Sequence, residues 1–206
     1  MKQARPDEIL KFWFSGLNDQ QLLDKKDPRV KRWFVKDARF DEEIRRCFES
    51  DLVNAGRGEY KEWEESAAGC LALVILFDQF SRNLYRNTQR MYAWDASALA
   101  LTLRSIDKKL DSDLQLIERI FLYMPLMHPE DLATQELSLK YFGQLVKESQ
   151  LRSPQNSAYF EYTFNYAQKH HAVINRFGRF PHRNAVLNRP SSAEEKDFLL
   201  QPGSFF

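Results

Sequence analysis

The sequence predicts a single all-α domain, residues 1–206, built from antiparallel helical hairpins. Apolar residues recur at spacings of three and four along most of the chain, which is the pattern of helices with one buried face. Clusters of Gly, Pro and Asn interrupt this pattern at intervals that suit short connections between paired helices. No stretch of the sequence shows the sustained alternation of apolar and polar residues that predicts a strand. The length also suits one domain with its own core.

Three helices are expected in the first half of the chain. Amphipathic segments run from residue 6 to 16, opened by a Pro-Asp pair, and from residue 40 to about 54. A third segment, 66–85, begins with small residues that allow close backbone packing and is apolar on all sides between residues 71 and 77. Because it has no polar side there, we expect it to be the buried central helix.

The second half of the chain predicts helices with apolar stripes. We expect Asp95 to cap a helix, Pro125 to bend or end the segment 116–126, and Pro129 to occupy the first turn of the next helix. The expected stripes are Leu99, Leu103, Ile106 and Leu110, then Leu132, Leu139, Phe142 and Val146. The helix before Gly178 carries two aromatic faces, which predict an interior helix or a pocket wall.

Composition argues against several classes of partner. The 30 basic and 29 acidic side chains leave a net charge of +1, so neither nucleic acid nor a membrane is expected as the main partner. The longest apolar run, 67–77, is too short to span a bilayer and no signal peptide is recognisable, so we expect a cytoplasmic protein.

Cys47 and Cys70 are far apart, which predicts reduced thiols. Without a Gly-rich phosphate loop or a G-x-S-x-G motif, no cofactor and no serine nucleophile are predicted.

The segment FDQFSRNLYR, residues 77–86, puts polar groups at the end of the central helix. Asp78, Arg82 and Tyr85 follow at spacings of four and three, so they share one helical face with apolar residues of the preceding turns. Charged groups on such a face are costly to bury unless each has partners. One interpretation is a structural ion pair. The other makes Arg82 an anion clamp that Asp78 positions.

The segment LMHPED, residues 126–131, combines a histidine with the start of a helix. Pro129, Glu130 and Asp131 suit the first turn and its positive end. Capping does not require His128, whose ring suits proton transfer or metal ligation. The sequence lacks HExxH or a comparable ligand spacing, so no metal site is predicted.

The segment RFGRFPHRN, residues 176–184, lies in the most unbalanced part of the sequence. No Asp or Glu occurs between Glu161 and Glu194, although basic residues and histidines are frequent there. These residues are Lys169, His170, His171, Arg176, Arg179, His182, Arg183 and Arg189. A helix C-terminus accounts for one or two of the arginines. The others either meet acids from elsewhere in the fold, such as Asp78 and Glu130, or bind an anionic ligand.

Together the three motifs, with HHAVINRFGRFPHRNAVLNR at 170–189, resemble a mainly bacterial family known as domain of unknown function 924. The likeness extends from the FWF near the start to the closing DFLLQPGSFF. It implies a tetratricopeptide-repeat-like helical fold and no established activity. The family's recurrent polar positions correspond to Asp78, Gln79, Arg82, Asn83, Asp95, His128, Glu130, Asp131, His170, Arg176, Arg179, His182, Arg183 and Asn184. Where the family usually has Leu-Gly-Arg, this chain has Asn188, a residue that tolerates a left-handed backbone.

These observations predict that the three motifs converge on one polar pocket, because isolated polar groups on apolar helices would be unstable. The leading hypothesis is binding of a small anionic molecule or an acidic peptide end, with Arg82, Arg179 and Arg183 as clamps. Phe180 and Tyr85 are the expected walls. A second hypothesis adds hydrolysis or group transfer, with His128 or His182 as general acid or base, oriented by Asp78 or Glu130. A third is a helical scaffold that grips a partner protein.

Overall fold

The computed structural model describes residues 4–204, in which helices are joined by turns and no residue is in a strand. The all-α prediction is therefore confirmed, and residues 1–3 and 205–206 of the expected domain lie outside the described residues. The tetratricopeptide-like arrangement stays a prediction. The helices are α1 (Ala4–Phe14), α2 (Pro28–Lys31), α3 (Ala38–Gly56), α4 (Ala67–Val74), α5 (Ser81–Leu84), α6 (Asp95–Asp107), α7 (Leu116–Tyr123), α8 (Leu132–Arg152), α9 (Ser157–Phe177) and α10 (Ala193–Leu199).

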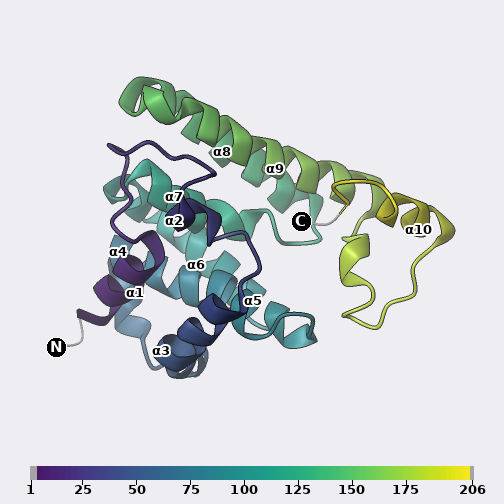
Figure 1. The fold of residues 1–206 in the computed structure, drawn as a ribbon, viewed down its shortest axis with the longest axis horizontal. Coiled ribbons are helices and arrows are strands. Elements are labelled where there is room, and N and C mark those ends of the chain that lie inside the picture. Colours follow the sequence, from purple (N-terminus) through teal and green to yellow (C-terminus); the bar gives the residue numbers. More distant parts are fainter. Residues whose placement is uncertain (1–3, 205–206) are drawn as a thin grey trace.

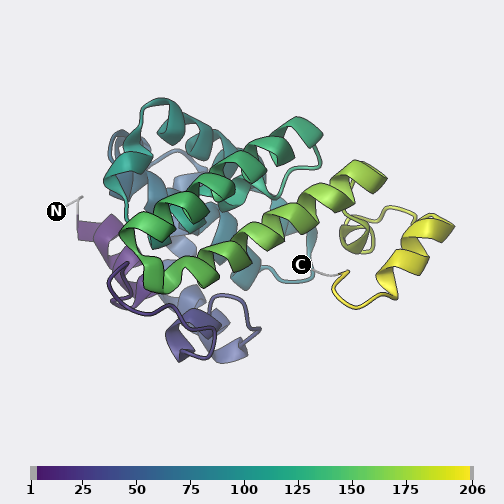
Figure 2. The same cartoon turned by 90° about the horizontal axis from the view of Figure 1, so that it is seen from above.

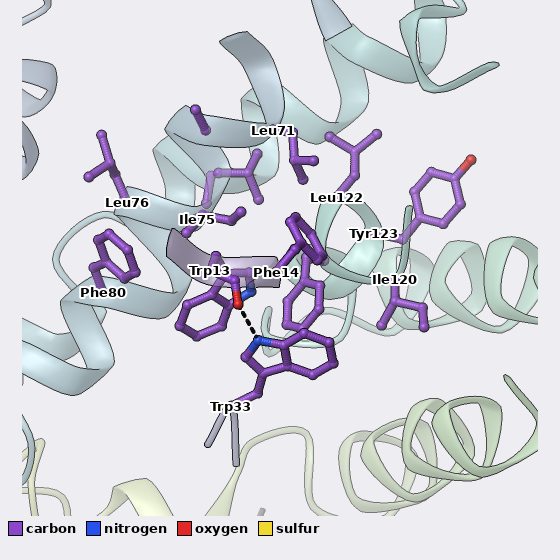
Figure 3. Close-up of a cluster of buried hydrophobic side chains, with 14 of the residues drawn as sticks. Trp13, Phe14, Trp33, Leu71, Ile75, Leu76, Phe80, Ile120, Leu122 and Tyr123 are labelled. Carbon is purple, nitrogen blue, oxygen red and sulfur yellow. Dashed lines mark hydrogen bonds between the residues drawn. The ribbon is translucent and has the colours of Figure 1, made fainter. Parts of the chain in front are cut away.

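The expected central helix is the core of the molecule. Helices α4 and α5 form one continuous rod, joined by a π-helical turn, Ile75–Phe80, and every residue from Gly69 to Ser81 is buried. Its neighbours are α1, α3, α6 and α7, whose apolar faces surround it. Figure 3 shows the aromatic part of this core, where the Trp33 indole nitrogen donates to the Trp13 carbonyl oxygen at 2.9 Å. The sequence did not predict the π turn, because its residues keep the apolar pattern of a regular helix.

Helices α8 and α9 form an antiparallel hairpin across one side of the molecule (Figures 1 and 2). The 3₁₀ turn Pro154–Asn156 connects them, and the Asn156 amide donates to the Gln21 carbonyl at 2.8 Å. The end of α9 leads away from the array to a C-terminal segment with α10 (Figure 1). That segment has a small core of its own, in which Val173, Ile174 and Phe180 are buried. The hairpin thus carries the RFGRFPHRN motif to the edge of the array.

Two predictions about helix starts were wrong. Asp95 is the first residue of α6 and not its cap, since its carboxylate pairs with Arg82. Pro129 lies in the turn before α8, and Asp131 caps that helix by accepting from the Thr134 amide at 2.8 Å. In both places a distant ion pair or a stronger cap overrides the local preference. The prediction for Pro125 is confirmed, because α7 ends at Tyr123 and a 3₁₀ turn follows.

The predicted stripes of α6 and α8 were partly wrong. Leu103 is 40% exposed and Leu132 39% exposed. The buried residues of α6 are Ala98, Leu101, Thr102 and Ser105, and those of α8 are Gln135, Ser138, Phe142, Leu145 and Ser149. Small and polar residues are buried because neighbouring backbones come close and offer carbonyl groups. The Thr102 hydroxyl, for example, donates to the Leu122 carbonyl at 2.7 Å.

Helix α9 is not interior, as one of its sides is exposed. Its two aromatic faces merge into one broad face whose buried residues include Tyr159, Phe160, His170 and Val173. The alternative of a pocket wall holds in part. Tyr162 and Tyr166 line an open surface cavity of about 410 Å³.

Gly69 is expected to be intolerant of a side chain. A Cβ atom there would lie 2.1 Å from the Trp63 carbonyl oxygen, which belongs to rigid backbone. We expect Gly69→Ala to lower the free energy of unfolding by about 1–3 kcal/mol, as overpacking does. Urea denaturation measures this. In the matched control Gly143→Ala, the nearest atom is 3.7 Å away, so better helix propensity should raise stability by about 0.5–1 kcal/mol. Equal stabilities of the two variants would contradict the prediction.

Candidate functional site

The π turn contains Asp78, which is completely buried. π turns inside α-helices are rare and frequently mark functional sites. The two carboxylate oxygens of Asp78 accept from the His128 Nδ1 and the Gln79 Nε2, each at 2.6 Å. Arg82 lies one turn later, with its Nη1 at 3.2 Å from Oδ1. Burial alone would raise the pKa of Asp78, but the neighbouring Arg82 and His128 lower it to about 2. Asp78 is therefore ionised at neutral pH.

His128 lies in the turn between α7 and α8 and is largely buried. The buried Gln135 side chain holds this turn by donating to the Met127 carbonyl at 2.6 Å and the Pro129 carbonyl at 2.8 Å. Since an ionised carboxylate can only accept, Nδ1 of His128 carries the proton and Nε2 carries the lone pair. Burial lowers the pKa of His128, although Asp78 opposes this effect. The ring is thus neutral at pH 7.

Two arginines flank Asp95, which comes from the first turn of α6. The Arg82 Nη1 lies 3.0 Å from Asp95 Oδ1. Arg183 is less well paired, because its Nη1 is 3.8 Å from Asp95 Oδ2 and its Nε has no hydrogen-bond partner among the described residues. The Arg183 side chain is only 9% exposed. Its guanidinium carbon lies 4.4 Å from the ring centre of Phe180 and 4.7 Å from that of Tyr92.

Burial and the nearby charge of Arg82 lower the pKa of Arg183. A buried guanidinium without close acceptors is uncommon, because removing an ion from water is costly unless hydrogen bonds replace the solvent. Arg183 is the group in this region whose charge the described residues satisfy least.

Two further histidines lie beside Phe180. The ring centres of His170 and His182 are each 5.5 Å from that of Phe180, and the His170 ring is 6.1 Å from His128. The His170 Nδ1 donates to the Tyr166 carbonyl at 2.8 Å. Burial lowers the pKa of His170 to about 3, with a smaller contribution from His128. Burial and the charge of Arg183 lower that of His182 to about 4. Both rings are neutral at pH 7.

We call this connected group of side chains the polar cluster. Its members are Asp78, Arg82, Tyr92, Asp95, His128, His170, Phe180, His182 and Arg183. The contacts join all three sequence motifs. Asp78 and His128 link the first to the second, and Glu130 accepts from the Phe180 amide at 2.8 Å, linking the second to the third.

The other arginines of the basic segment have acidic partners. Arg176 pairs with Glu194 at 2.8 Å, Arg179 with Glu195 at 2.6 Å and Arg189 with Glu130 at 2.6 Å. Asn184 lies between Arg189 and Glu195, donating to the latter at 3.4 Å. The basic segment had two interpretations, pairing with acids from elsewhere in the fold or binding of an anionic ligand. For these three arginines the structure shows pairing with acids. Arg179, expected as a clamp, faces α10.

Tyr85 and Asp131 lie apart from the polar cluster. The Tyr85 hydroxyl donates to Glu49 on α3 at 3.0 Å, and its ring stacks on Trp94. Asp131 is exposed and caps α8. Sequence reasoning missed Tyr92, which no motif singled out, and the pairing of Asp95, which was interpreted as a cap. The left-handed backbone expected at Asn188 is present, with φ of 54°.

Other kinds of site find little support in the described part of the chain. No group of three or more His, Cys, Asp and Glu residues between residues 4 and 204 is arranged to hold a metal ion. Across the same residues, no helix has the length and apolarity needed to cross a membrane. Cys47 and Cys70 are both free thiols. A second open cavity, of about 390 Å³, lies beside Arg5, Asp51 and Tyr60, away from the polar cluster.

Comparisons with known proteins place the chain in a family. No curated protein matches it significantly. The solved structure of the protein of unknown function ATU0120 from Agrobacterium tumefaciens is similar, with 32% sequence identity and a TM-score of 0.78. That match covers 97% of this chain and 99% of the other. The family model described as "Bacterial protein of unknown function (DUF924)" matches residues 9–203. With nearly its whole length matched, the chain belongs to the DUF924 family, as the motifs predicted.

Proposed function

We propose that the protein binds a small anionic molecule, or the carboxylate end of an acidic peptide, at the polar cluster. The observation that carries this proposal is the state of Arg183. Its side chain is nine-tenths buried, its guanidinium lies against the rings of Tyr92 and Phe180, and it is 3.8 Å from its nearest carboxylate. The planar fork of arginine is suited to carboxylates and phosphates, which would supply the acceptors that the described residues lack.

The charge balance of the cluster supports the same ligand class. Arg82 and Arg183 face Asp78 and Asp95, and the three histidines are neutral at pH 7 because burial lowers the pKa of each. Asp78 is already occupied by Arg82, His128 and Gln79. An arriving anion therefore meets no uncompensated negative charge, and Arg183 is available to it. The free thiols of Cys47 and Cys70 suit a reducing compartment, so we propose that the protein works in the cytoplasm.

The test is a thermal-shift experiment with inorganic phosphate and with succinate. An anion present at a hundred times its dissociation constant stabilises the native state by about 2.7 kcal/mol, a shift of several degrees in Tm for a domain of this size. We expect Arg183→Met, which keeps an apolar stem beside the two rings, to abolish the shift. Arg176→Met, which removes a surface arginine paired with Glu194, should keep it. A shift that persists in Arg183→Met would overturn the proposal, as would a folded wild type that responds to neither anion.

A further inference from the structure

We propose that His128 is a general base for hydrolysis of an acyl compound that carries a second, anionic group, and that Asp78 is its positioning residue. The inference rests on the proposed function, since the anionic group would be held by Arg183. It adds a reaction, a nucleophile and a substrate class to that site.

The geometry of the pair is that of an oriented base. Asp78 accepts the Nδ1 proton of His128 at 2.6 Å, which leaves the lone pair on Nε2. Asp78 is held in turn by Gln79 and Arg82, and the π turn fixes the backbone beneath it. A base whose hydrogen-bond partner is itself held rigidly by other side chains keeps its catalytic geometry without reorganisation.

The electrostatic surroundings let His128 accept a proton, and they then stabilise the imidazolium that results. The ring is neutral at pH 7, since burial lowers its pKa. Once protonated, the imidazolium lies beside the ionised carboxylate of Asp78. The other titratable groups that face it are Arg82 from α5, Asp95 from α6, His170 from α9 and His182 from the 3₁₀ turn Pro181–Arg183. Arg82 disfavours a lasting positive charge on His128, and the two histidines are neutral at pH 7, so the proton is readily passed on.

Water is the nucleophile that this arrangement suits. The polar cluster, as defined by its described residues, contains no Ser, Thr or Cys side chain that His128 could activate. The oxygen of a water molecule attacks the acyl carbon while one of its protons moves to Nε2 of His128. The carbonyl electron pair shifts to oxygen, and the resulting oxyanion is stabilised by a guanidinium. When the carbonyl reforms, the bond to the leaving oxygen breaks. The proton on Nε2 then passes to the leaving group or to solvent, which restores the free base.

The probe for this reaction is mono-p-nitrophenyl succinate, an activated ester with a free carboxylate, compared with neutral p-nitrophenyl acetate. We expect the wild type to hydrolyse the succinate ester well above the buffer rate and to prefer it to the acetate. His128→Asn keeps an amide donor for Asp78 but removes Nε2, so kcat should fall by about 100-fold or more, the usual contribution of a general base. The thermal shift with succinate should remain. The control is His171→Asn, which replaces the half-buried histidine next to His170 on α9 and should leave kcat unchanged.

Asp78→Asn tests the positioning role separately. It should lower kcat with little change in KM and alter the pH profile of kcat, because the ring loses a charged partner. Nitrogen-15 NMR of wild-type His128 should show the proton on Nδ1. A proton on Nε2 would overturn the assignment.

The outcomes distinguish this inference from the proposed function. Full hydrolysis by His128→Asn would overturn the inference. So would a wild type that shows the succinate shift but hydrolyses neither ester, although anion binding would stand. Hydrolysis of both esters at equal rates, without any thermal shift with succinate, would instead overturn the proposed recognition of an anion. If His128→Asn does not fold, diethyl pyrocarbonate acylation of the wild type replaces it. The rate of hydrolysis should then fall in proportion to the fraction of protein modified at Nε2 of His128. Activity retained by fully modified protein would overturn the proposal.

Discussion

Asp78→Ala is expected to lower the free energy of unfolding by about 3 kcal/mol or more, the range found when one partner of a buried ion pair is removed. Asp78 is completely buried, and its loss leaves the donors of His128 and Gln79 without their acceptor. Arg82 would keep the Asp95 carboxylate, at 3.0 Å, and the backbone carbonyl of residue 78, to which it donates at 2.7 Å, but would lose one of its two carboxylate partners. Urea denaturation at pH 7 measures the change.

Asp131→Ala is the matched control for this variant. Asp131 is an exposed aspartate that caps α8, and loss of such a cap costs about 1 kcal/mol. Similar losses for the two variants would mean that Asp78 is better solvated or less strongly paired than its contacts indicate.

Stability is expected to fall on acidification from about pH 6.5 to pH 4. The pKa of His170 is lowered to about 3 and that of His182 to about 4, against an ordinary value of 6.5. Below pH 6.5 the unfolded chain binds protons on these rings while the folded chain does not, so each proton favours unfolding. A one-unit difference is worth about 1.4 kcal/mol, so His170 alone would remove about 3 kcal/mol by pH 4. Asp78 affects stability at lower pH, because its stabilising contribution is complete above about pH 4 and is lost as the pH falls toward 2.

Urea denaturation at pH 7 and pH 4 tests this dependence. His170→Gln, which does not titrate in this range, should reduce the difference in unfolding free energy between the two pH values. His171→Gln replaces the adjacent histidine, which is only half-buried, and should leave that difference as in the wild type. Equal differences in the two variants would show that His170 is protonated in the folded protein well above pH 4.

Local signals predicted much of the helical framework. The all-round apolar segment of α4 and the stop at Pro125 depend on neighbouring residues alone, and both are present. Helix α1 is present too, but it begins at Ala4 and not at the Pro-Asp pair. The stripes of α6 and α8 were less accurate, because Ser138 and Thr102 are buried by close backbone packing and not by hydrophobicity. Asp95 was assigned to a cap because its partner, Arg82, lies 13 residues away and belongs to another helix.

The sequence by itself determined the helical class, the position of the central helix and the three motifs in which polar groups gather, because periodicity, caps and local charge are properties of short segments. Only the tertiary structure decided which of those groups meet. Asp78 and His128 are 50 residues apart and touch because the π turn and the α7–α8 turn pack together. Packing also pairs Arg176 and Arg179 with α10 and leaves Arg183 against two rings. Which arginine is free for a ligand depends on distances between helices, and no spacing along the chain specifies them.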